Sequence, residues 1–153
     1  MRAKNVLLVE DRPGDARLTQ EAFRAAGAFA QLHVVNDGME ALTYLKPPGG
    51  PAATVRPDLI LLDLNLPKLD GRDLLAQLKK DRELAAIPVI ILTASAIPGD
   101  VEDCYESGAC CFLTKPDQWD PHELLVQRII DFWLTDPPLA MVRRSPEKAS
   151  SEA

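Results

Sequence analysis

The chain has 153 residues, of which 46% are hydrophobic, enough for one domain with a full core. Its formal net charge of −6 and the lack of a basic stripe argue against nucleic-acid binding, so we expect no DNA partner. The apolar runs are too short to cross a bilayer, and the first residues lack a signal-peptide pattern, so we expect a cytoplasmic protein without membrane contact.

Apolar runs and turn residues divide the first part of the chain into strands and helices. The predicted order is a strand over 5–9, a helix from 13 until Gly27, a strand over 32–35 and a helix over 39–45. We expect the first helix to bury a face formed by Leu18, Ala22, Ala25 and Ala26. A loop rich in Pro and Gly follows over 46–57 and is longer than most connections of this kind.

The same alternation continues after this loop. The predicted order is a strand over 58–63, a loop over 64–70, a helix after Gly71, a strand over 89–92, a helix over 98–108, a strand over 110–113 and a helix over 121–135. Uniformly apolar strands that alternate with helices predict an α/β fold with a parallel sheet covered on both faces. We expect this domain to span 1–136, and 137–153 to form a C-terminal extension that is partly disordered.

Chemically distinctive residues follow four of the five predicted strands. They are the pair Glu10 and Asp11, then Asp63, Thr93 and Lys115. Each of them alone is typical of a helix cap or a solvated side chain. Because the carboxyl ends of parallel strands meet at one edge, where ligands collect in open α/β sheets, the whole set is poorly explained by capping. We therefore expect Asp63 to act as a nucleophile that accepts a phosphoryl group.

The motifs that carry this set are specific when they are taken together. They are Val-Glu-Asp at 9–11, Asp-Leu-Asn-Leu-Pro at 63–67, Asp-Gly at 70–71, Thr-Ala-Ser at 93–95 and Lys-Pro at 115–116. Over about 5–135 the chain resembles the receiver domain of two-component response regulators. The resemblance implies a flavodoxin-like, doubly wound sheet of five parallel strands in the order 2-1-3-4-5, with helices on both faces.

The resemblance also implies a magnesium-dependent reaction. Asp11 and Asp63 would bind Mg²⁺ directly, Glu10 would bind it through water, and Asn65 would bind it through its backbone carbonyl; Mn²⁺ can substitute. Asp63 would then take the phosphoryl group from a phosphohistidine on a sensor histidine kinase. Lys115 and the Thr93 hydroxyl would stabilise the transferred group. Such a protein is not an enzyme in the usual sense, since it catalyses only its own phosphorylation and dephosphorylation.

In the receiver family, phosphorylation is read through a few further positions. The resemblance implies that Thr93 moves toward the phosphoryl group and that Phe112 rotates inward behind it. Asn65 and Ser95 would border the approach of water and tune the lifetime of the phosphorylated state. An aromatic residue on a strand is by default a core residue, and the spacing of Phe112 to Lys115 is what favours the switch role.

The last predicted helix is apolar over more than half of its circumference, which exceeds what one sheet face can cover. We expect a homodimer through this helix, with Ile129, Phe132 and Trp133 at the interface and the segment 139–142 reaching the partner. The alternative is that 139–142 folds back over the helix within one chain. The motif over 10–18, the long loop and the ending at 131–134 resemble the single-domain regulators of bacterial and cyanobacterial phytochromes, which implies a bacteriophytochrome kinase as partner.

Other functions remain open to the same residues. A dehalogenase-like phosphatase also uses an aspartyl nucleophile, but it needs a second Asp two residues later, where this chain has Asn65. A receiver-fold adaptor that takes no phosphate typically lacks an acidic residue or the Lys, and this chain has all of them. A phosphorelay intermediate that passes the phosphoryl group to another protein is the remaining alternative.

Overall fold

The computed structural model describes residues 4–25, 30–50, 55–93, 98–106, 108–109, 111–114, 124, 126–127 and 129–130. Its elements are β1 (Lys4–Val9), α1 (Pro13–Ala25), β2 (Ala30–Val35), α2 (Gly38–Leu45), β3 (Leu59–Leu62), α3 (Gly71–Lys80), β4 (Val89–Thr93), α4 (Pro98–Glu106) and β5 (Cys111–Thr114). Strands and helices alternate as the sequence predicts, with bounds that shift by one or two residues.

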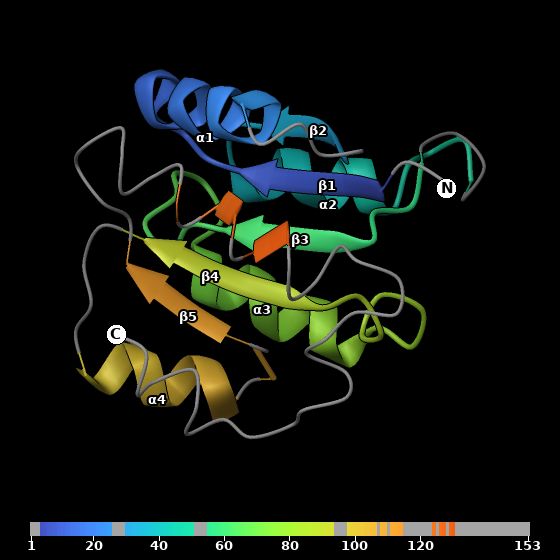
Figure 1. The fold of residues 1–153 in the computed structure, drawn as a ribbon. Helices are drawn as coiled ribbons and strands as arrows, with labels where there is room; N and C mark the ends of the chain where they lie inside the picture. The colour runs from blue at the N-terminus through green and yellow to red at the C-terminus, as the bar shows by residue number, and fades with distance from the viewer. Residues whose placement is uncertain are drawn as a thin grey trace.

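The strands form a single parallel sheet in the order β2-β1-β3-β4-β5, so the predicted fold class and strand order are confirmed (Figure 1). The order reverses beside β1, because β2 lies on one side of it and β3 on the other. In an open α/β sheet, ligands bind outside the carboxyl ends of the strands at such a switch point. Val9 of β1 pairs with Leu62 of β3 in register, which brings the residues that follow these two strands to the same edge.

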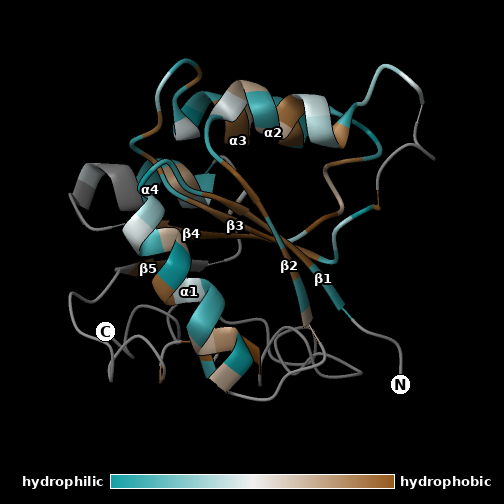
Figure 2. Cartoon of the chain, turned by 90° about the horizontal axis from the view of Figure 1, so that it is seen from above, coloured by the Kyte–Doolittle hydropathy of each residue, from teal (hydrophilic) through white to brown (hydrophobic). Residues whose placement is uncertain are grey.

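Two apolar clusters cover the two faces of the sheet, and alternate strand residues point into each. Leu7, Val9, Ile60 and Leu62 face the cluster that includes residues of α2, α3 and α4. Val6, Leu8, Leu59 and Leu61 face the other cluster, which includes residues of α1 together with Val126 and Ile129. In Figure 2 the hydrophobic strands lie between α2 and α3 on one side and α1 on the other. The sheet therefore has both faces covered, as its uniformly apolar strands predict.

The buried face of α1 differs from the predicted one. The structure buries Ala16, Thr19, Ala22 and Phe23, whereas Ala25 is exposed and Leu18 is only partly buried; Ala26 lies outside the described residues. The face is rotated because Phe23 has the larger apolar area to remove from water. Thr19 can be buried beside it because its hydroxyl donates a hydrogen bond to the Asp15 carbonyl oxygen at 3.1 Å.

The described residues beyond β5 bear on the predicted last helix. Residues 124, 126, 127 and 129 have helical backbone. Val126 and Ile129 are buried against the sheet, while Leu124 is 58% exposed. The remainder of this helix and the extension over 137–153 lie outside the described residues. None of the helices in the described part of the chain has the length and apolar character that a bilayer crossing requires.

Candidate functional site

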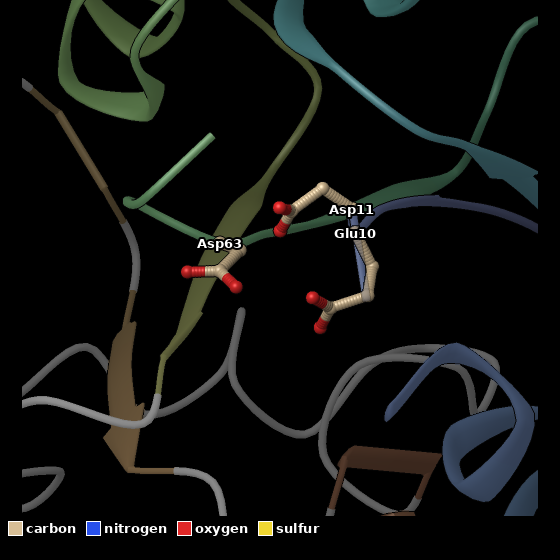
Figure 3. A group of neighbouring side chains, drawn as sticks. All are labelled: Glu10, Asp11 and Asp63. Atoms are coloured by element: carbon tan, nitrogen blue, oxygen red, sulfur yellow. The ribbon is translucent and has the colours of Figure 1, made fainter. Parts of the chain in front are cut away.

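Three carboxyl groups converge at the carboxyl edge of the sheet. Glu10 and Asp11 follow β1, Asp63 follows β3, and one oxygen from each lies within 4.8 Å of the others (Figure 3). Glu10 is 2% exposed and Asp63 is 5% exposed, while Asp11 is more accessible. The structure thus brings together the three acidic residues that the sequence places at strand ends.

The main chain sets the position of two of these residues directly. The Asp63 N–H donates to the Val9 carbonyl oxygen at 3.2 Å, which extends the β1–β3 ladder by one residue. The Glu10 N–H donates to the Val35 carbonyl oxygen at 3.0 Å and extends the β1–β2 ladder in the same way. Because both anchors are ladder hydrogen bonds, the backbone of the site is as rigid as the sheet itself.

Neighbouring N–H groups orient the acidic side chains. The Asn65 N–H donates to Asp63 Oδ1 at 3.1 Å, and the Arg12 N–H donates to Glu10 Oε2 at 3.3 Å. Each of these bonds spans two residues, so the chain that leaves each strand turns back toward its own carboxylate. Arg12 also accepts the first hydrogen bond of α1, from the Ala16 N–H at 3.0 Å, which ties the helix start to the site.

Gly71 closes the loop over 64–70 against the backbone of Asp63. Its N–H donates to the Leu64 carbonyl oxygen at 2.9 Å, and α3 begins at this residue with Asp70 as its N-cap. A Cβ at position 71 would clash with the Asp63 carbonyl oxygen and would lie 2.7 Å from Leu64 Cα. Only glycine therefore permits α3 to start this close to Asp63.

The same loop also contacts the start of α2. Asp37 is the N-cap of α2, and its Oδ1 accepts from the Glu40 N–H at 2.8 Å. Lys68 of the loop places Nζ 3.5 Å from Asp37 Oδ2. The hydrogen bond from the Glu40 N–H lowers the pKa of Asp37 despite its burial, and the Lys68 ammonium lowers this pKa further.

The chemistry of the three carboxylates suits a divalent cation. Ionised carboxylates this close repel one another, and a cation bound between them removes the repulsion. All three donors are oxygen atoms, which Mg²⁺ prefers, and Mg²⁺ normally completes its octahedron with water. The donor set therefore fits Mg²⁺ or Mn²⁺ better than a softer metal.

Several predicted site residues are placed only in part. Thr93 ends β4 and pairs with Thr114 of β5, and Phe112 pairs with Ile91, but the side chains of Thr93 and Phe112 are not among the described ones. Lys115 directly follows the last residue of β5 and lies outside the described residues, as do Ser95, Phe132 and Trp133. Asn65 is exposed in the loop after Asp63.

The position of Ile129 contradicts its predicted place at a dimer interface. Ile129 is 2% exposed and packs in the core beside β1 and β3, so it is not available to a partner in this fold.

The response regulator receiver domain matches residues 6–129 of this chain. The chain belongs to this family. The response regulator Rcp1 from Synechocystis sp. strain PCC 6803 is 43% identical over 131 residues, which cover 86% of this chain and 89% of Rcp1.

Solved structures of receiver proteins agree with this assignment. The Mn²⁺-bound form of Rcp1 has a TM-score of 0.79, and the match covers 86% of this chain and 94% of the Rcp1 chain. The phosphorylated cyanobacterial phytochrome response regulator RcpA has a TM-score of 0.81 at 43% identity and covers 87% of this chain and 95% of its own. The receiver domain of the sensor histidine kinase PA1611 from Pseudomonas aeruginosa PAO1, which has a magnesium ion in its active-site cleft, has a TM-score of 0.66 at 30% identity, covering 86% and 98%.

Two residues next to the site were not predicted from the sequence. Asp37 precedes the helix predicted over 39–45, and the pattern of Asp37 followed by Glu40 is that of a capping box. In the structure Glu40 Oε1 accepts from the N–H of Asn36, one residue before the cap, at 2.9 Å, so the return bond reaches one residue further than in a standard capping box. Lys68 carries no comparable signal, since its partner is distant in the sequence.

Proposed function

We propose that Asp63 is the phosphoacceptor of a response regulator, with Mg²⁺ held by Asp11 and Asp63 directly, by Glu10 through water and by the Asn65 carbonyl. The observation that carries the proposal is the convergence of three carboxylates within 4.8 Å at the β1–β3 switch point. The family assignment, the Mn²⁺ and Mg²⁺ in related receivers and the phosphorylated state of RcpA support it. Mn²⁺ would substitute for Mg²⁺.

The reaction needs little covalent participation from the protein. A carboxylate oxygen of Asp63 forms a bond to phosphorus while the P–N bond of a phosphohistidine breaks, and the electron pair of that bond stays on the imidazole nitrogen. The divalent cation neutralises charge on the phosphoryl oxygens, as cations do in phosphoryl transfer generally. The protein's own contribution is position, since the ladder hydrogen bond from the Asp63 N–H fixes the attacking residue against β1.

The remaining predicted site residues have the roles that membership of the receiver family implies. Lys115, directly after β5, would pair with the phosphoryl group, and the Thr93 hydroxyl at the end of β4 would donate to it. Phe112 would follow Thr93 inward and pass the change to the outer surface of α4 and β5. Asn65 and Ser95 would set how easily water reaches the acyl phosphate, which the protein itself hydrolyses.

We also propose that the protein forms a homodimer and that its kinase partner is of the phytochrome type. The support for the kinase is the similarity to Rcp1 and RcpA, the second of which is a phytochrome response regulator. Since such a kinase uses ATP, the exchange would take place in the cytoplasm. For the dimer the interface would be formed by Phe132, Trp133 and the segment 139–142. Leu124, 58% exposed in the same region, is consistent with an outer face of that helix that remains to be covered.

The phosphoacceptor is tested by incubation with acetyl phosphate, with and without Mg²⁺, followed by intact-protein mass measurement. Wild type should gain the mass of one phosphoryl group only when Mg²⁺ is present, and Asp63→Asn should gain nothing. Asp73→Asn removes an exposed carboxylate from α3 and serves as the matched control, which should react like wild type. Metal-dependent modification that survives in Asp63→Asn would show that another residue is the acceptor.

A further inference from the structure

The loop over 64–70 adopts an unfavourable backbone conformation beside the site. Lys68 has φ of 68°, and among the described residues other than glycine it alone has positive φ. The Leu69 N–H donates to the Pro67 carbonyl oxygen at 2.8 Å, so the chain makes a three-residue turn centred on Lys68. A side chain in this left-handed region costs about 1 kcal/mol, and such a conformation persists only where the surroundings hold it.

An ion pair with the N-cap residue of α2 stabilises this turn. Lys68 Nζ lies 3.5 Å from Asp37 Oδ2, and the Asp37 side chain is 9% exposed while that of Lys68 is 69% exposed. The carboxylate cannot move toward another partner without giving up its bond to the Glu40 N–H, the first-turn bond that caps α2. A fixed, nearly buried anion thus faces a cation on a strained loop.

The backbones of the two segments also touch at this point. A Cβ at position 38 would clash with the Leu69 carbonyl oxygen and would lie 2.7 Å from Leu69 Cβ, so Gly38 allows the loop to rest on the first residue of α2. The two ends of the loop are joined by a hydrogen bond, in which the Gly71 N–H donates to the carbonyl oxygen of Leu64, the first loop residue. Asn65 lies between these anchors, and its N–H is bonded to Asp63.

We propose that the Lys68–Asp37 ion pair is a positioning element of the metal site, which holds the loop over 64–70 so that the Asn65 carbonyl faces the cation. This inference rests on the proposed function, in which that carbonyl is a ligand. The pair does not touch the metal. It acts through the loop, by favouring the strained conformation at Lys68, so that metal binding does not have to order the segment that carries the carbonyl.

The size of the effect follows from the exposure of the pair. An ion pair with one exposed partner contributes about 0.2–1 kcal/mol, which corresponds to at most about a fivefold change in a binding constant. Removal of Lys68 should therefore weaken metal binding by about two- to fivefold at low ionic strength, and by less at high salt because the exposed ammonium is screened.

The test measures Mn²⁺ binding directly, from the paramagnetic resonance signal of the free ion, without any phosphodonor. Lys68→Gln should raise the Mn²⁺ dissociation constant about two- to fivefold, and Lys68→Arg should restore most of the affinity. Asp37→Asn should behave like Lys68→Gln, because asparagine still caps a helix but carries no charge. The double variant should be no weaker than either single one, since both substitutions break the same pair.

Lys46→Gln is the matched control. It removes an ammonium of similar exposure, 63%, from an ion pair with Asp81 at 3.0 Å that joins α2 to the residue after α3. It should change stability slightly and leave the Mn²⁺ dissociation constant unchanged. Lys68→Gly tests the backbone separately: it lacks the ammonium but adopts positive φ without strain, so it should recover part of the Mn²⁺ affinity that Lys68→Gln loses.

The outcomes separate the two proposals. If the wild type binds Mn²⁺ and Lys68→Gln binds it with the same dissociation constant, the positioning role is overturned but the proposed metal site is not. A dissociation constant in Lys68→Gly no lower than that in Lys68→Gln would contradict the part that the strained turn plays in this role. Failure of the wild type to bind Mn²⁺ would refute the proposed function and the inference together. Faster hydrogen exchange at the Leu69 amide in metal-free Lys68→Gln would show the loosened loop independently of the metal.

Discussion

Replacement of Gly71 by alanine tests how closely α3 is packed against the phosphoacceptor. Gly71 is buried, and a Cβ there would meet the Asp63 carbonyl oxygen and Leu64 Cα, both of which are main-chain atoms. Cβ contacts in proteins are not shorter than 3.0 Å, and the distance to Leu64 Cα would be 2.7 Å. The backbone must therefore separate by at least about 0.3 Å at Leu64, and by more at Asp63.

The expected cost is that of overpacking, about 1–3 kcal/mol of the free energy of unfolding. For a domain of this size each kcal/mol lowers the melting temperature by about 2–4 °C, so Gly71→Ala should melt roughly 3–10 °C below wild type. The displaced atoms belong to Asp63 and its neighbour, so modification by acetyl phosphate in the presence of Mg²⁺ should also slow. Urea unfolding and the rate of the mass shift measure the two effects.

Gly14→Ala is the control for the substitution itself. Gly14 lies in the first turn of α1, and a Cβ there would have no atom within 4 Å. Alanine should be neutral at this position or stabilise the protein by up to about 1 kcal/mol, because it has the higher helix propensity. If Gly71→Ala were as stable as Gly14→Ala and were phosphorylated at the wild-type rate, the close approach of α3 to Asp63 would be refuted.

Three further predictions concern charge and assembly. Carboxylate oxygens of the three acidic residues lie within 4.8 Å of one another, and two unit charges about 4 Å apart repel by at most about 4 kcal/mol at an effective dielectric constant of about 20. Glu10→Gln should therefore raise the stability of the metal-free protein and reduce the gain in stability from Mg²⁺. Urea unfolding in chelator and in Mg²⁺ measures both effects, and a less stable metal-free variant would contradict the prediction. The pKa of Asp37 is lowered by folding, so its contribution is present above its unfolded pKa and is lost as the pH falls through the lower folded value. Asp37→Asn keeps the helix cap but loses the ion pair, so it should be less stable than wild type by about 0.2–1 kcal/mol at neutral pH, and the two unfolding curves should converge in acid. Trp133→Glu should convert the proposed dimer to a monomer in light scattering, whereas a monomeric wild type at micromolar concentration would remove the dimer proposal.

The sequence was sufficient to predict the arrangement of the strands and the acidic site. β1 and β3 each end in a short apolar run, and the carboxylates that follow these two runs are visible without any structure. Because parallel strands align their carboxyl ends, the meeting of Glu10, Asp11 and Asp63 follows from topology and requires no knowledge of side-chain packing.

Features that depend on packing were predicted less well. The buried face of α1 was assigned by periodicity, which cannot weigh Leu18 against Phe23 without the shape of the opposing sheet. The Lys68–Asp37 pair depends on a positive φ at a lysine and on contact between two distant loops. The need for glycine at position 71 likewise comes from the path of β3, not from its immediate neighbours.

The ladder hydrogen bonds that extend past β1 and β3 have a consequence for how such a protein can diversify. The backbones of Glu10 and Asp63 are positioned by main-chain hydrogen bonds from their own N–H groups, which do not depend on the side chains that the outer helices present. Substitutions on the solvent-facing surfaces can therefore retarget the protein to new kinases or receptors without retuning its chemistry. Recognition and reaction can evolve as separate modules within one small domain.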